Sequence, residues 1–339
     1  MKKNFFFAAI AASSMAFVSC SDDDDSNGNN PSDPDRELFA SSNTSGMISY
    51  TDLTATSPMA RMFGIGSLDV DGIYFDDDRN EIIVASRTNN RLEVYGNFRE
   101  ALTSTATTLE MTASSATGDF TNAREIAVDD NRVIVVQDQN EGNGNQNKLI
   151  VYQRTSTGFT REKTFNIGFK LWGIDIEDGN LYAVEDLSNR VAVFNNIFSK
   201  AEGTLTPDKV VGIEGLVRTH GINFSDDDNT LILTDVGDAN SSTDGGIVII
   251  ENFSSVWNAA ANGGTIALTN QKRIYGPNSL LGNPVDVAFD DDRNIIYVAE
   301  RANGGGRILS YAYPTAAQSD ANPIMNRTEA GATAVYLRD

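Results

Sequence analysis

The stretch Asp71–Ser86, DGIYFDDDRNEIIVAS, contains the pattern that decides the fold. A short apolar strand is followed by an Asp-rich turn and then by a second strand rich in β-branched residues. The same pattern returns four more times, in Glu125–Asp138, Trp172–Asp186, His220–Asp235 and Asp286–Glu300. Five copies of one strand pair predict a repeat architecture built from β-hairpins.

Further strand-like segments follow each hairpin. A third strand is expected at Leu92–Tyr95, Leu149–Tyr152, Val191–Phe194, Ile247–Ile250 and Ile308–Tyr311. A fourth is expected at Lys163–Phe165, Lys209–Val211 and Lys272–Tyr275. Four strands that recur about every 50 residues are typical of a propeller blade.

The spacing of the copies locates an insertion. The aligned positions Gly72, Glu125, Gly173, Gly221 and Asp286 are 53, 48, 48 and 65 residues apart. The last interval therefore holds extra residues, and both 237–246 and 254–264 are candidates for them.

The two ends of the chain supply a sixth blade. Thr333–Asp339 is expected to be its first strand, Arg36–Ser42 its second, Gly46–Tyr50 its third and Arg61–Ile65 its fourth. Closing the ring in this way removes an open sheet edge that would favour aggregation. We therefore predict an all-β fold over residues 36–339: a six-bladed β-propeller with four-stranded blades, whose closing blade is shared by the N- and C-termini.

The repeated aspartates lie where each hairpin turns. Asp side chains favour turns because they bond to nearby backbone N–H groups. Calcium binding is the alternative, but no copy has the spaced Asp loop with a distal glutamate that an EF-hand needs. We interpret the aspartates as hairpin turns.

The pattern of a Gly-Ile-x-Phe strand, an Asp turn and an Ile-Tyr-Val-Ala strand resembles NHL-repeat propellers and, more distantly, the SMP-30/gluconolactonase-like group. The resemblance covers about residues 36–339 and implies a fold that hosts both binding proteins and enzymes. Lactonase-like members bind a divalent ion in the channel, but no convincing residue-by-residue match to their motif exists here.

The first 35 residues carry export features. Lys2 and Lys3 precede an apolar run, Phe5–Val18. Ser19 and Cys20, the only cysteine, follow this run directly. The run has the length of a signal-peptide core. Its end resembles a bacterial lipobox, which implies a signal peptide over 1–19 and acylation (palmitate) of Cys20.

The residues after Cys20 predict a tether over 20–35. Asp22–Asp25 opens a polar stretch that cannot bury apolar surface. A cysteine followed by acidic residues also resembles the surface-export signal of Bacteroidota lipoproteins. We expect a protein anchored in the outer membrane and exposed at the cell surface, with a periplasm-facing orientation as the alternative.

The formal charge of -21 limits the partners. An acidic surface repels phosphate backbones and anionic bilayers, so nucleic-acid binding is not expected. The charge keeps an exposed protein soluble and mildly favours cationic partners or metal ions. The membrane is expected to be reached through the acyl group on Cys20.

In a propeller, the loops that lead into first strands and out of second strands meet at one end of the channel, which we call the rim. Charged and bulky residues interrupt the repeat there, so we predict a ligand-binding rim that contains Asp71, Arg124, Glu125, Trp172, Glu185, His220, Asp235, Asp286 and Glu300. Ser41, Ser86, Arg87, Gln137, Asp138, Asp186, Arg301 and Thr333 occupy equivalent positions.

Two aromatic residues of the rim have alternative roles. His220, the only histidine, is either a hydrogen-bonded channel residue or a candidate catalytic base. Trp172 is either a stacking platform for a sugar or a plug of the channel.

The rim carboxylates also suggest a metal. Glu125, Asp235 and Asp286 are candidate ligands for Ca²⁺ or Mg²⁺. Ion pairs with Arg124 and Arg301 are the alternative.

Three functions remain open. The first is a surface lipoprotein that binds a glycan, another small molecule or an outer-membrane partner protein at its channel. The second is a metal-dependent hydrolase or lactonase, and the third is a protein-interaction scaffold with no channel ligand.

Overall fold

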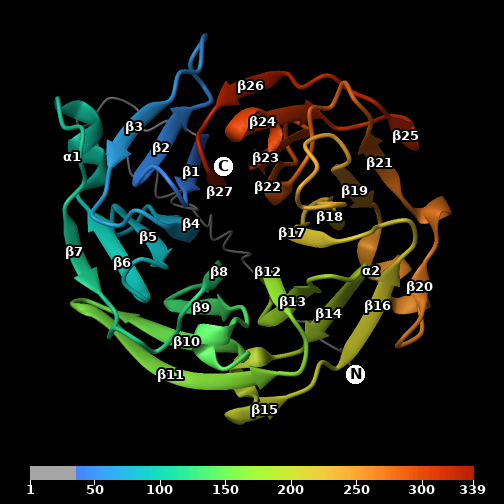
Figure 1. Ribbon diagram of the computed structural model, residues 1–339, viewed down its shortest axis with the longest axis horizontal. Coiled ribbons are helices and arrows are strands. Elements are labelled where there is room, and N and C mark those ends of the chain that lie inside the picture. The colour runs from blue at the N-terminus through green and yellow to red at the C-terminus, as the bar shows by residue number, and fades with distance from the viewer. Residues whose placement is uncertain (1–35) are drawn as a thin grey trace, which may run out of the picture. The chain divides into compact units, whose positions relative to one another are not determined.

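The computed structural model describes residues 36–339, which form six blades around a central channel (Figure 1). Blade 1 consists of β4 (Val70–Asp76), β5 (Glu81–Ser86), β6 (Arg91–Gly96) and β7 (Met111–Ser114). Blade 2 consists of β8 (Ala123–Asp129), β9 (Arg132–Gln137), β10 (Asn147–Thr155) and β11 (Gly158–Ile167). Blade 3 consists of β12 (Leu171–Glu177), β13 (Asn180–Glu185), β14 (Arg190–Phe194) and β16 (Lys209–Ile213).

The next two blades repeat this order. Blade 4 consists of β17 (Thr219–Ser225), β18 (Thr230–Asp235), β19 (Gly246–Ile250) and β21 (Lys272–Tyr275). Blade 5 consists of β22 (Pro284–Asp290), β23 (Ile295–Glu300), β24 (Arg307–Ala312) and β26 (Met325–Thr328). Two short helices, α1 (Phe98–Thr103) and α2 (Phe253–Ala259), precede the fourth strands of blades 1 and 4. No helix among residues 36–339 is long and apolar enough to cross a membrane.

Blade 6 joins the two ends of the propeller and confirms the predicted closure. It consists of β27 (Ala332–Arg338), β1 (Glu37–Ser42), β2 (Met47–Asp52) and β3 (Arg61–Gly64). β27 pairs antiparallel with β1, with Arg338 opposite Glu37 and Ala334 opposite Ser41. The C-terminal strand is thus the innermost strand of a blade whose other strands come from the N-terminal side.

Blades 2, 3 and 4 each have a fifth strand, and this strand belongs in the sequence to the segment that forms the next blade. β15 (Gly203–Leu205) pairs with β11, β20 (Thr265–Ile266) with β16, and β25 (Gln318–Ser319) with β21, each in parallel. These three strands, which we call strap strands, pair with two or three residues at the outer edges of blades 2, 3 and 4. The paired part of each edge cannot pair with other chains.

The hydrophobic core lies between neighbouring blades. Between blades 6 and 1, the rings of Phe39 and Phe75 stack with centroids 4.7 Å apart, and Phe98 of α1 packs against both at 5.3 Å. Each inner strand places a buried aliphatic residue at the same register: Ile73, Ile126, Ile174, Ile222, Val287 and Val335. The alternate residues of these strands face the channel.

Glycine allows the inner strands to approach one another. A Cβ atom at Gly173 would lie 2.2 Å from the carbonyl oxygen of His220, and one at Gly221 would lie 2.7 Å from Cα of Asp286. The repeated glycine is therefore a packing requirement of the channel. At the same register, Glu125 and Asp286 replace glycine and bring a carboxyl group into the channel.

Candidate functional site

The rim end of the channel is occupied by a cluster of ion pairs. Its members alternate in charge, in the order Arg87, Asp71, Arg124, Asp138, Lys170, Asp186 and Arg218. The shortest contacts join Arg218 Nε to Asp186 at 2.6 Å and Lys170 Nζ to Asp186 at 2.7 Å. The cluster joins blades 1 to 4, and each cation in it has a carboxylate partner.

Trp172 and His220 form the centre of this cluster. Their rings stack in parallel with centroids 3.6 Å apart, and the guanidinium of Arg124 lies 4.0 Å from the other face of the indole. Both faces of Trp172 are therefore covered by the protein's own side chains. This arrangement matches a plug of the channel better than an open stacking platform.

His220 is held neutral beside Asp186. Burial lowers the pKa of His220 to about 4, although its Nε2 lies 3.1 Å from Asp186 Oδ1. Hydrogen bonds from His220, Arg218 and Lys170 hold the pKa of Asp186 far below its usual range despite burial of the carboxylate. Because the neutral ring donates through Nε2, Nδ1 is the acceptor, and the described residues offer it no donor.

The carboxylates at the ends of second strands bond mainly to loops. Asp235 accepts hydrogen bonds from the N–H groups of Val217 and Arg218, at 3.0 and 2.9 Å. Glu300 accepts from four backbone N–H groups, among them Gly282 and Asn283 at 2.9 Å. Glu185 pairs with Arg190 of its own blade. The contacts of Asp235 and Glu300 fix loops of the rim, whereas Glu185 pairs across two strands of its blade, and none of the three lines the cavity described next.

A cavity in the channel lies toward the opposite end, where the first strands turn into the second strands. We call it the chamber, and its volume is about 300 Å³. Side chains from all six inner strands line it: Tyr74, Glu125, Asp175, Asn223, Asp286 and Tyr336. This volume is at the lower end of the range for small-molecule sites.

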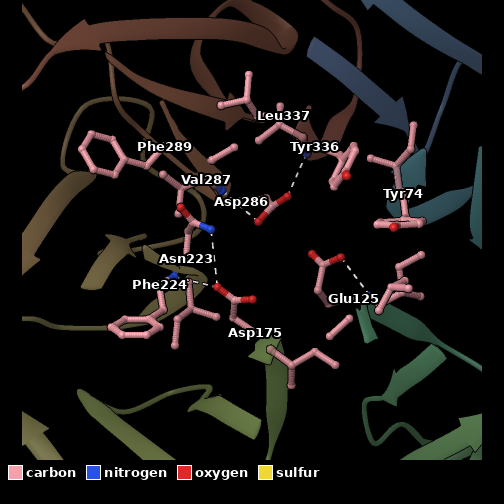
Figure 2. A pocket seen from close by; sticks show the side chains of 18 of the residues that line it. Tyr74, Glu125, Asp175, Asn223, Phe224, Asp286, Val287, Phe289, Tyr336 and Leu337 are labelled. Atoms are coloured by element: carbon pink, nitrogen blue, oxygen red, sulfur yellow. Dashed lines mark hydrogen bonds between the residues drawn. The ribbon is translucent and has the colours of Figure 1, made fainter. Parts of the chain in front are cut away.

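Three carboxyl groups point into the chamber from three different blades (Figure 2). Asp286 accepts from the N–H groups of Val287 and Val335, both at 2.8 Å. Asp175 accepts from Ile176 N–H at 2.8 Å and from Phe224 N–H at 2.6 Å. These two carboxyls therefore also join their strands to the next blade.

Glu125 is the least constrained of the three. Its Oε1 accepts from the N–H of Ile126 at 2.8 Å, and the described residues provide no hydrogen-bond donor for Oε2. One carboxyl oxygen is therefore left for a ligand.

Burial raises the pKa of all three carboxyls. The pKa of Asp175 rises to about 7 and that of Asp286 to about 8, with loss of solvation as the main cause in both. Burial also raises the pKa of Glu125 well above its usual value, and repulsion from Asp286 raises it further. None of the described residues that line the chamber is Lys, Arg or His, so no basic side chain in the lining offsets this effect.

The structure separates the candidate metal ligands of the sequence. Among residues 36–339, no group of three His, Cys, Asp or Glu side chains is placed to hold one ion. Asp235 is bound to rim loops, whereas Glu125 and Asp286 line the chamber. The three candidate ligands of the sequence are thus not brought together.

The structure divides the predicted rim residues among three places. Glu125 and Asp286 line the chamber, and Asp71, Arg124, Trp172 and His220 belong to the rim cluster. Asp235 and Glu300 hold loops, and Glu185 pairs with a neighbouring strand, so these three lie outside both.

Asp175, Tyr74 and Tyr336 are chamber residues that the sequence reasoning missed. They lie two positions after the repeated glycine or its equivalent. Because side chains alternate along a strand, this spacing places them on the channel side and could have identified them. The predicted signal peptide, Cys20 and the tether lie outside the described residues.

Comparisons with solved structures agree on the fold. The chain is similar to a protein in a nidogen/laminin complex, with a TM-score of 0.59 and 13% identity over 90% of this chain and 98% of the other. It is also similar to a protein of unknown function from Bacteroides caccae, with a TM-score of 0.58 and 9% identity over 89% and 98%. A 6-phosphogluconolactonase-like protein from Bacteroides fragilis NCTC 9343 gives a TM-score of 0.58 and 10% identity over 92% and 100%.

No protein-family model matches the chain, and no curated protein matches its sequence. At these identities the structural similarities establish the propeller fold alone.

Proposed function

We propose that this propeller is a binding protein that holds a small molecule in the chamber. The observation that carries the proposal is the group of three chamber carboxyls, with Glu125 and Asp286 buried and Asp175 half-buried, and no basic residue in the described lining. Burial of carboxyl groups is unfavourable unless they are neutralised or paired. Perturbed pKa values of this kind concentrate at functional sites.

The propeller would work at the cell surface. The motif at Cys20 and the acidic residues after it support an acyl anchor in the outer membrane and a tether that carries the domain away from it. Labelling with a palmitate analogue tests the anchor. Label on the wild type and none on a Cys20→Ala variant is the expected result, and equal labelling of both would refute it.

Lactone hydrolysis has less support from the geometry. His220, the candidate base, is bound to Asp186 and stacked on Trp172 in the rim cluster, and it does not line the chamber. A phosphorylated substrate also has no basic partner among the described lining residues. A partner protein on the outer faces is the remaining alternative, and the likeness to a protein in a nidogen/laminin complex is consistent with such a role.

A ligand panel tests the proposal. Sugars, amino acids, amines, nucleosides and divalent metal ions are screened by thermal shift, and each hit is titrated by calorimetry. We expect a hit whose affinity falls at least tenfold in Glu125→Gln and is unchanged in Glu110→Gln, a matched change at an exposed site. A hit that is unaffected by Glu125→Gln, or the absence of any hit, would refute a chamber site.

A further inference from the structure

The turns at the chamber end form an acidic ring. In every blade from 1 to 5, the turn between first and second strands is acidic: Asp76–Asp78, Asp129–Asp130, Glu177–Asp178, Asp226–Asp228 and Asp290–Asp292. Arg79 and Arg293 lie within these turns and Arg132 follows one of them. Arg36, Arg99 and Arg338 from neighbouring segments pair with Asp77, Asp290 and Asp292. The thirteen carboxylates of the turns still outnumber these six arginines, so negative charge predominates. A mouth of one sign raises the local concentration of the opposite charge.

The acidic ring and the chamber are continuous. Asp291 of the blade 5 turn and the C-terminal Asp339 line the chamber together with Asp286. Neighbouring turns also affect one another: burial first, and then the charges of Asp226, Asp178 and Asp129, raise the pKa of Glu177. Acidic side chains therefore continue from the surface into the channel.

We propose that the chamber binds a small organic cation, an alkylammonium compound with one to three amino groups, which enters through the acidic ring. This inference rests on the proposed function and names its ligand class. An ammonium group supplies an N–H donor for Oε2 of Glu125, which has none among the described residues. It also supplies a positively charged partner for Glu125, Asp175 and Asp286, which the chamber lining does not provide.

The shape of the chamber favours an organic cation over a metal ion. A cavity of about 300 Å³ is much larger than one ion, and its carboxyls are not grouped around one point. Tyr74 and Tyr336 line one side, with ring centroids 4.9 Å apart. Aromatic rings attract alkylammonium groups and also cover the hydrocarbon part of such a ligand.

Binding of the cation should release protons. The titratable groups that face one another along the channel are Asp71 and Tyr74 on β4, Glu125 on β8, Asp175 on β12, Asp286 on β22 and Tyr336 on β27, with Arg124 on the rim side and Asp291 and Asp339 at the mouth of the chamber. Without ligand, burial keeps protons on the chamber carboxyls near neutral pH. An ammonium ion favours the ionised carboxylates, so a carboxyl proton passes to the buffer as the ligand binds.

Calorimetry with matched four-carbon probes tests the ligand class. Putrescine is compared with 1,4-butanediol, which is neutral, with succinate, which is anionic, and with Mg²⁺ and Ca²⁺. We expect saturable binding of putrescine alone, at least tenfold weaker in Glu125→Gln and unchanged in Glu110→Gln. In two buffers of different ionisation enthalpy, the heats should show proton release near pH 7, and affinity should increase up to about tenfold per pH unit for each proton released.

The outcomes separate this inference from the proposed function. A neutral or metal ligand that binds with dependence on Glu125 would refute the organic cation and keep the chamber as the site. Putrescine binding that is the same in Glu125→Gln, with both proteins equally stable to heat, would refute the site. No binding of putrescine, spermidine or a monoamine would refute the cation class.

The acidic ring has its own test. Asp226→Asn combined with Asp227→Asn removes two exposed carboxylates from the mouth and leaves the chamber unchanged. We expect slower association of putrescine at low salt, with the difference lost at high salt. An association rate equal to that of the wild type at low salt would show that the ring does not attract the ligand.

Discussion

Neutralising Glu125 should change how the stability of the propeller depends on pH. In Glu125→Gln, the side-chain oxygen can still accept from the N–H of Ile126. The new NH₂ group replaces Oε2, which accepts no hydrogen bond from the described residues, so the substitution breaks no contact of the folded chain. It removes one carboxyl whose pKa is raised in the folded state.

The direction of the pH dependence follows from whether the folded or the unfolded state binds more protons. In the folded protein, the pKa values of Asp175 and Asp286 are about 7 and about 8, so these carboxyls hold protons above pH 6.5. The raised pKa of Glu125 acts in the same direction. The unfolded chain, with ordinary carboxyl pKa values of about 4, has released them. The folded state therefore binds more protons, and its stability falls as the pH rises.

The magnitude follows from the number of protons. Each proton held only by the folded state lowers the free energy of unfolding by about 1.4 kcal/mol per pH unit. Asp175 and Asp286 together hold between one and two protons near pH 6.5, which gives a decrease of about 2–3 kcal/mol per pH unit. Because the pKa of Glu125 is also raised, Glu125→Gln should make the slope shallower than that of the wild type, by up to about 1.4 kcal/mol per pH unit. His220, whose pKa is lowered to about 4, has the opposite effect between about pH 4 and 6.5, so the measurement starts above that range.

Urea denaturation at half-unit steps from pH 6.5 to 9, followed by tryptophan fluorescence, measures the slope. Trp172 and Trp257 are both packed against other residues in the folded chain and report its unfolding. Glu110→Gln is the control and should reproduce the wild-type slope. A wild-type stability that does not decrease above pH 6.5, or a Glu125→Gln slope equal to that of the wild type, would refute the reasoning.

Three further perturbations test other parts of the structure. Gly173→Ala places a Cβ atom 2.2 Å from the His220 carbonyl oxygen, so we expect a loss of about 2–3 kcal/mol in urea denaturation; a loss below 0.5 kcal/mol would contradict the close approach. Arg154→Met leaves buried Glu81 without the partner 2.7 Å away and should destabilise the fold by about 3–5 kcal/mol, whereas Arg161→Met, at an exposed pair, should change stability by less than about 1 kcal/mol; similar losses for both would be evidence against the burial argument. Deleting 333–339 removes most of β27 and uncovers β1, so we expect aggregation in light scattering, and a monomer with the wild-type melting temperature would disprove closure.

Much of the fold could be predicted because it depends on local pattern. The pairing of 333–339 with 36–42 followed from counting strands and from the need to close an open edge, and it is confirmed. The turn chemistry is also observed, since Asp76 and Asp290 each accept from the N–H three residues later. Asn80, Asn229 and Asn294 end their turns with positive φ, which Asn tolerates better than most residues.

The site was harder to predict because it depends on contacts between blades. The sequence analysis considered the loops and therefore selected Trp172 and His220, but the stacking of one on the other requires two inner strands to be adjacent. It overlooked Asp175, which lies within a strand and is exposed to the chamber only through alternation. Glu125 and Asp286 were selected as loop residues, although they lie on the inner strands at the glycine register and face the chamber.

The strap strands have a consequence for how the domain opens. The outermost hydrogen bonds of blades 2, 3 and 4 are made with strap strands, and each strap strand comes directly after the third strand of the next blade in the chain. Detaching blade 3, 4 or 5 therefore also exposes the edge of the blade before it. Amide hydrogens of β11, β16 and β21 that bond to strap strands should consequently exchange with deuterium when the following blade separates, which links local opening from blade 2 to blade 5.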